Sequence, residues 1–172
     1  MNKYDVIIIG AGPSGIFCAY ELMRQKPDMK VLMIEKGRSI EKRQCPKRTT
    51  KVCVGCKPCS ITTGFAGAGA FSDGKLSLSP DVGGTLPEIL GYEKAEELIK
   101  EADNIYLKFG ADEKVYGIDD YDAIERIRAK AIRANLKLIE CPIRHLGTEE
   151  GYKIYTRLQE HLLASGVEIK FM

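Results

Sequence analysis

The chain has 172 residues, enough for one domain with a hydrophobic core and too few for the two-domain architecture of most cofactor-dependent enzymes. Its 26 Lys and Arg against 24 Asp and Glu give a net charge of +2, which argues against binding to nucleic acid or to an anionic membrane surface. No apolar run approaches the roughly 18 residues of a membrane span, and the N-terminus lacks a secretory signal. We therefore expect a soluble, cytoplasmic protein with reduced cysteines.

The first motif of the chain is a strand, a glycine turn and a helix. The β-branched run at residues 6–9 predicts a parallel strand buried on both faces, and an amphipathic helix pattern follows the turn "GAGPSG". In such a turn the first glycine makes the bend, the second lets the backbone approach a diphosphate and the third lets helix and strand pack closely. The turn therefore predicts a dinucleotide site at Gly10, Gly12, Pro13, Ser14 and Gly15.

A second apolar run at residues 31–34 ends in Glu35, twenty residues after Gly15. A dinucleotide-binding fold places its ribose-binding acid there, and that acid accepts hydrogen bonds from the ribose hydroxyls and repels a 2′-phosphate. We therefore expect FAD or NAD rather than NADP. The alternative is an ordinary glycine-rich turn with a solvated Glu.

At this point the chain resembles the two-dinucleotide-binding-fold flavoproteins, and within them the bacterial FAD-dependent dehydrogenases. The resembling stretches are "DVIIIGAGPSGIFCAYEL", "VLMIEKG", "CKPCSITTGFAGAGAFSDGKLSL" and "IRHLGT". The resemblance implies a Rossmann-like FAD/NAD(P)-binding α/β fold, a parallel sheet with flanking helices. It also implies that the adenosine diphosphate half of FAD contacts Gly10, Gly12, Gly15 and Glu35, with Lys36 and Gly37 beside the ribose.

The resemblance further implies that the segment "GAGAFSDGK" reaches toward the diphosphate and the flavin. Without the family, its glycines still exclude a helix or a plain strand and allow close approach to a ligand. A flexible connector is the alternative. The family has Gly-Gly-Ala-Gly where this chain has Phe65 and Ala66 before Gly67, which shifts the expected contact. The predicted cofactor contacts in this segment are Gly67, Ala68, Gly69, Ser72, Asp73, Gly74 and Lys75.

Three cysteines are spaced three residues apart, with a fourth eight residues upstream and a fifth in a distant Cys-Pro pair. This pattern is typical of a thiolate site for an iron-sulfur cluster or zinc. A redox dithiol and a loop that merely packs beside the cofactor are the alternatives. The candidate ligands are Cys45, Cys53, Cys56 and Cys59, with Cys141 as an alternative fourth ligand.

Other residues have simpler interpretations. Cys18 falls on an apolar position of the first helix and is predicted to be a small core residue. For His161 we expect a solvated helix surface, and for His145 a structural and a functional role stay open. The sequence offers no general base or nucleophile with an identifiable partner, so no catalytic residue is assigned.

The remaining elements follow from periodicity. We expect helices over residues 92–109 and 121–134, a strand at residues 136–141, a helix capped by Thr148 and ended at Gly166, and a last strand at residues 167–171. One domain results, residues 1–172, with residues 1–40 and 136–172 as the sheet core and residues 41–135 as an excursion.

The family continues with further segments, so we expect this chain to be the N-terminal part of a larger flavoprotein. The predicted function is the FAD-binding portion of a flavin-dependent dehydrogenase acting on an unidentified small molecule. A non-catalytic thiolate module and an NAD-binding enzyme are the alternatives.

Overall fold

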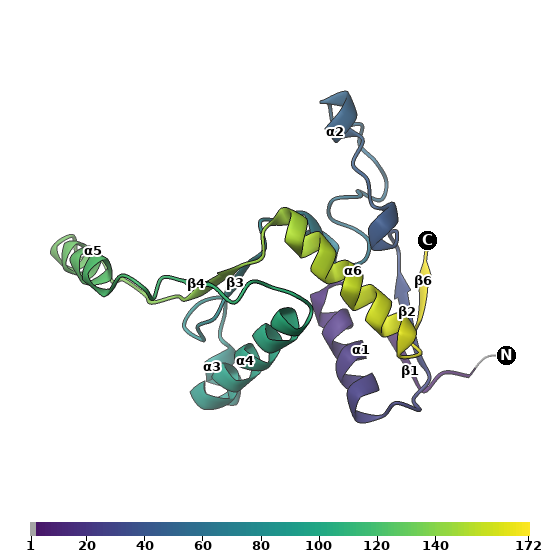
Figure 1. Ribbon diagram of the computed structural model, residues 1–172, viewed down its shortest axis with the longest axis horizontal. Coiled ribbons are helices and arrows are strands. Elements are labelled where there is room, and N and C mark those ends of the chain that lie inside the picture. The colour runs from purple at the N-terminus through teal and green to yellow at the C-terminus, as the bar shows by residue number, and fades with distance from the viewer. Residues whose placement is uncertain (1–2) are drawn as a thin grey trace. The chain divides into compact units, whose positions relative to one another are not determined.

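A computed structural model describes residues 3–172 of the chain (Figure 1). Residues up to Gly74 and from Gly147 onward form one compact unit, and Lys75–Leu146 form another. The second unit is thus one continuous insertion between two parts of the first. Among residues 3–172, no helix has the length and apolar content that a membrane crossing requires.

A parallel sheet forms the centre of the first unit. β1 (Val6–Ile9) pairs with β2 (Val31–Glu35), which pairs on its other edge with β6 (Glu168–Phe171). Helix α1 (Pro13–Gln25) connects β1 to β2, and α6 (Thr148–Ala164) leads into β6. The predicted α/β class with a parallel sheet is confirmed, and so is the third strand.

The core of the first unit lies between this sheet and helices α1 and α6, which lie side by side in Figure 1. Its fully buried side chains include Ile16, Val31, Met33, Ile154, Leu158 and Leu162. The prediction that β1 is buried on both faces is wrong, because Ile7 and Ile9 are 55% and 77% exposed whereas Ile8 is buried. Alternate side chains of a strand point to opposite faces, and in the described chain one face of β1 is uncovered.

Short elements occupy the segment between β2 and the second unit: η1 (Ile40–Lys42), α2 (Lys47–Thr50) and η2 (Gly67–Phe71). A side chain of α6 holds the first of them, because the side-chain oxygen of Gln159 accepts a 3.0 Å hydrogen bond from the N–H of Ile40. Gln159 is buried, so this contact ties the loop after β2 to the core.

The start of α6 differs by one residue from the prediction that Thr148 caps it. Gly147 is the N-cap, with a φ of +71°, and Thr148 is the first helical residue. The N–H of Gly147 donates a 3.0 Å hydrogen bond to the carbonyl of Asp73, which sets the turn at the glycine. The predicted end is confirmed, because Gly166 follows the helix with a φ of +95°.

The second unit is an antiparallel sheet with three helices. β5 (Ile143–His145) lies between β3 (Lys75–Ser77) and β4 (Val115–Tyr116). The helices are α3 (Leu86–Leu90), α4 (Tyr92–Lys108) and α5 (Tyr121–Arg133), and the last two confirm the predicted helices.

Arg144 fixes the second unit from the middle of its sheet. Its guanidinium donates to both carboxylate oxygens of Asp103, at 2.5 and 2.8 Å, and to the carbonyl of Asp112 at 2.6 Å. The strand predicted at residues 136–141 is wrong, because that stretch is irregular. The apolar residues of this stretch pair with no neighbouring strand. The chain joins the sheet only at Ile143, opposite Ser77.

Candidate functional site

The glycine turn between β1 and α1 has the geometry that its sequence predicts. Gly10 has a φ of +98°, which favours glycine. A Cβ on Gly15 would lie 2.1 Å from the carbonyl oxygen of Gly10, so this position must be glycine for the helix to pack against the turn. A Cβ on Gly12 would meet no atom within 4 Å. The space over Gly12 is therefore open, at the N-terminus of a helix whose first turn has Pro13.

Glu35 joins three separate segments of the chain through its carboxylate. One oxygen accepts a 2.8 Å hydrogen bond from the N–H of Ala11 in the glycine turn. The other accepts from the N–H groups of Gly37, at 2.8 Å, and Gly64, at 3.0 Å. A carboxylate has about four acceptor positions, so these three donors leave about one for a ligand. This junction was not predicted from the sequence, which suggested a carboxylate open to both ribose hydroxyls.

The glycine segment, by which we mean residues 64–75, lies directly against the turn. The N–H of Ala66 donates a 2.7 Å hydrogen bond to the carbonyl of Ala11, and Ala66 itself has a φ of +69°. A Cβ on Gly37 would lie 2.4 Å from the nitrogen of Gly64, so the two backbones touch. These contacts bring the loop after β2, the glycine turn and the glycine segment to one place.

Arg43 shapes the segment that precedes η2. Arg43 is 3% exposed, and its guanidinium donates hydrogen bonds to the carbonyls of Ser60, Ile61, Phe65 and Gly67, at 2.5 to 3.0 Å. The guanidinium also lies 4.6 Å from the ring centre of Phe71. Burial lowers the pKa of Arg43, while Glu35 and Cys59 oppose that shift, and an arginine stays charged at neutral pH.

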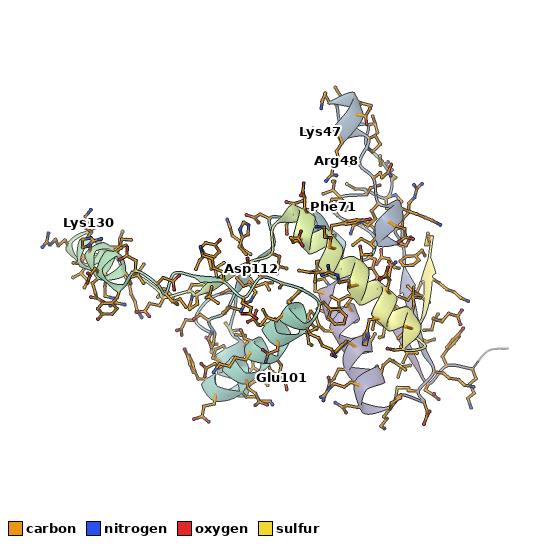
Figure 2. All side chains as sticks on the ribbon, in the orientation of Figure 1. Lys47, Arg48, Phe71, Glu101, Asp112 and Lys130 are labelled. Carbon is orange, nitrogen blue, oxygen red and sulfur yellow. The ribbon has the colours of Figure 1, made fainter. Side chains whose placement is uncertain are left out.

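Sequence reasoning missed Arg43, because nothing distinguishes it from the neighbouring cations of the run "EKRQCPKR". One of those neighbours, Arg48, has its guanidinium carbon 5.4 Å from the centre of the same Phe71 ring but is exposed. Arg48 and Phe71 are labelled in Figure 2. Only the fold decides which basic residue is enclosed.

These segments surround a hollow of about 420 Å³, which we call the glycine cleft. Five of the predicted site residues line it: Gly10, Gly12, Glu35, Lys36 and Gly67. The hydroxyl-bearing residues Thr62 and Thr63 also line the glycine cleft and were not predicted. Their signal in the sequence was weak, since a Thr pair beside glycines is common in loops.

The other predicted contacts of the glycine segment have different surroundings. A Cβ on Gly69 would lie 3.1 Å from the hydroxyl of Tyr155, so Gly69 packs on α6. Ser72 donates to the carbonyl of Gly69 and accepts from the N–H of Gly74, each at 3.1 Å, which closes a local turn. Lys75 belongs to β3 of the second unit, opposite His145. Ala68 and Asp73 are exposed beside this turn.

The cysteines do not form the predicted metal site. Among residues 3–172 no three His, Cys, Asp or Glu side chains are grouped as metal ligands, and all six cysteines are free thiols. Cys141 lies in the second unit, with its sulfur 2.9 Å from the hydroxyl of Ser77. The spacing of Cys45, Cys53, Cys56 and Cys59 places them along one loop without directing them to one point, so zinc or an iron-sulfur cluster has no support here.

Three further expectations meet the structure differently. Cys18 is exposed on α1, so the prediction of a core residue is wrong. The His161 ring lies 5.4 Å from that of Tyr20, so it packs against α1 instead of standing free in solvent. His145 is exposed in β5, with its ring 6.4 Å from that of Tyr116.

Comparisons with known proteins give one family match and one curated relative for the N-terminal residues. Residues 1–41 match the Thi4 family. A thiamine thiazole synthase from Coprinopsis cinerea is 52% identical over 33 residues, which are 19% of this chain and 10% of that protein.

The fold matches a solved structure over nearly the whole chain. A 3-ketosteroid-delta4-(5alpha)-dehydrogenase from Rhodococcus jostii RHA1, in complex with 4-androstene-3,17-dione, has a TM-score of 0.51 at 18% identity. The match covers 98% of this chain and 37% of that one. This chain shares the dehydrogenase's fold. The predicted fold is therefore confirmed over the matched part of that structure.

An L-amino acid deaminase from Proteus vulgaris matches with a TM-score of 0.48 at 12% identity, over 99% of this chain and 40% of the deaminase. The chain thus spans well under half the length of each of these relatives.

Proposed function

We propose that the first unit binds FAD in the glycine cleft and serves as the flavin-binding part of an oxidoreductase. The observation that carries the proposal is the junction at Glu35, where the glycine turn and the glycine segment meet over one hollow. The match to the Thi4 family covers the strand, turn, helix and acid of this site, and the dehydrogenase fold supports the same use of the cleft.

The residues present fit such a cofactor. The open space over Gly12 is a backbone cradle that any side chain would fill, and it lies at the positive end of α1. A diphosphate placed there receives hydrogen bonds from the free N–H groups of the first helical turn. Bound FAD would supply the acceptor or donor of hydride or of single electrons.

The chain's own groups then hold the cofactor. The remaining acceptor position of Glu35 takes one ribose hydroxyl, and the Lys36 side chain lies beside it at the cleft wall. Thr62 and Thr63 line the same hollow, and the Thr63 hydroxyl can donate to a phosphate oxygen. Because Arg43 holds the segment that carries these residues, the cleft is formed before the ligand binds.

The test is reconstitution of purified protein with FAD, followed by removal of the excess and an absorbance spectrum. We expect flavin bands in the wild type and none in Gly12→Val, because the added β-carbon meets no atom of the fold and the side chain fills the cradle. Ala164→Val, at an exposed position of α6, is the matched control and keeps the bands. A wild type that retains no flavin, although folded, contradicts the proposal.

The same experiment addresses NAD as the alternative occupant. FAD and NAD share the adenosine diphosphate that the cleft fits, so Glu35 does not distinguish them. Displacement of bound FAD by excess NAD, followed through flavin fluorescence, measures the preference. We expect FAD to remain bound.

A further inference from the structure

A second hollow of about 420 Å³ lies beside the glycine cleft in the first unit. Lys36 and Thr63 line both hollows, so the two share a wall. We call the second hollow the basic pocket, after the cations that line it: Lys36, Arg38, Arg43 and Lys57. No Asp or Glu side chain lines it.

Three of the four cations of the basic pocket lack anionic partners. Lys36, Arg38 and Lys57 are exposed, and in the part of the chain that the structure describes they form no ion pair. Residues 36–63 hold eight Lys and Arg against one acid, Glu41, a net charge of +7 in a chain whose total is +2. A hollow lined by one sign of charge concentrates ions of the opposite sign.

Hydrogen bonds fix the backbone that forms the wall of the basic pocket, although three of the four cations on it are exposed. Arg43 is fixed by four carbonyls, and one of these belongs to Ser60, which also lines the pocket. The N–H of Gly64, next to Thr63, is fixed on Glu35. The backbone of this wall is therefore already ordered before a ligand binds, and the side chains that line it can adjust to the ligand.

We propose that the basic pocket binds the phosphate group of a small molecule. Arg and Lys are the side chains that recognise phosphate, and hydroxyls complete its hydrogen bonds. The volume falls within the roughly 300–1,000 Å³ of small-molecule sites. Glu35 does not line this pocket; its charge acts on the buried Arg43, and the three exposed cations Lys36, Arg38 and Lys57 are left to attract an anion.

The phosphate has two possible sources, a separate phosphorylated molecule or a 2′-phosphate on a dinucleotide in the glycine cleft, because Lys36 borders both. The chemistry is the same in either case. This site goes beyond flavin binding, since FAD carries only the diphosphate that the glycine turn receives.

Inorganic pyrophosphate is the probe, titrated into the purified protein by calorimetry. We expect Arg38→Gln/Lys57→Gln to weaken binding about tenfold or more, since two exposed charge contacts are removed. Lys26→Gln/Lys30→Gln removes two exposed cations before the N-terminal end of β2, whereas Lys36 follows its C-terminal end, and it leaves the affinity unchanged. Gly12→Val removes any diphosphate binding at the glycine turn, and we expect the binding that depends on Arg38 and Lys57 to remain.

Two results would overturn the proposal: equal affinity of the Arg38/Lys57 variant and the wild type, or loss of binding in Gly12→Val, which would place the anion on α1. If the protein binds no flavin but loses pyrophosphate affinity only in the Arg38/Lys57 variant, the phosphate site is supported and only the flavin proposal is refuted.

Competition then identifies the source of the phosphate. If NADP displaces pyrophosphate and NAD does not, the phosphate belongs to a dinucleotide. If neither displaces it, the phosphate belongs to a separate molecule.

Discussion

The carboxylate of Glu35 accepts a hydrogen bond from the N–H of Gly64, 29 positions later in the chain, at 3.0 Å. This contact joins the end of β2 to the glycine segment, and the same carboxylate reaches the turn after β1 through Ala11. The residue that sequence patterns assign to the ribose is thus also the one that assembles the cleft.

Glu35→Gln is expected to destabilise the first unit. A glutamine amide group carries donors where the carboxylate has only acceptors, so at least one of the N–H groups of Ala11, Gly37 and Gly64 loses its partner. We expect a loss of about 1–3 kcal/mol in the free energy of unfolding, measured by urea denaturation. Glu160→Gln, exposed on α6, should change it by less than about 0.5 kcal/mol. Equal stabilities of the two variants would contradict the assembling role of Glu35.

Gly12 and Gly15 are expected to respond differently to alanine. Gly15→Ala forces a methyl group against the carbonyl of Gly10, so we expect a loss of about 1–3 kcal/mol in unfolding free energy. Gly12→Ala meets open space and has a φ of −75°, so its loss should be about 1 kcal/mol or less. Thermal unfolding of both variants, alone and with FAD, separates folding from binding. Equal losses without FAD would show that the turn is packed differently.

Arg43→Lys should disrupt the segment before η2. A lysine ammonium has three donors at one point and cannot replace a planar guanidinium that bonds four carbonyls. We expect a loss of about 2–4 kcal/mol in unfolding free energy and faster proteolysis at residues 60–67. Arg48→Lys is the matched control, because Arg48 lies over the same Phe71 ring from an exposed position. Unchanged proteolysis in Arg43→Lys would refute the role given to Arg43.

Cys59 is expected to react at lower pH than an ordinary thiol. The backbone N–H groups of Ile61 and Thr62, then the Thr62 hydroxyl and Arg43, favour the thiolate and lower the pKa of Cys59. Iodoacetamide reacts with the thiolate, so the pH midpoint of its reaction rate follows the pKa of Cys59. We expect this midpoint to be higher in Thr62→Val than in the wild type, because the variant lacks the Thr62 hydroxyl. Mass spectrometry of the Cys59 peptide gives both profiles. A downward shift in Thr62→Val would contradict this assignment.

The local part of the fold could be predicted from the sequence. β1, the glycine turn, α1 and β2 follow from residue types that act on their own neighbours, such as Gly10 at a bend and an apolar face on α1. Helices α4, α5 and α6 likewise follow from their periodicity. These features need no knowledge of distant contacts.

The contacts that build the site could not be predicted, because they join segments far apart in the chain. Arg43 reads as one cation among many until the carbonyls of residues 60–67 surround it. The spacing of the cysteines suggests a common ligand, yet spacing fixes only how far apart residues can be, not whether their side chains converge. The apolar residues of the stretch 136–141 likewise predict a strand, but a strand also needs a partner in register.

The hydrogen bond from Gly147 to the carbonyl of Asp73 has an architectural consequence. The chain leaves the first unit and returns to it at two neighbouring points, so the two connections to residues 75–146 lie next to each other. A tight turn of a few residues could join Gly74 to Gly147 directly, and the parallel sheet with its two helices would keep every connection it now has. The antiparallel unit is in this sense a module whose removal would leave the topology of the parallel-sheet unit unchanged.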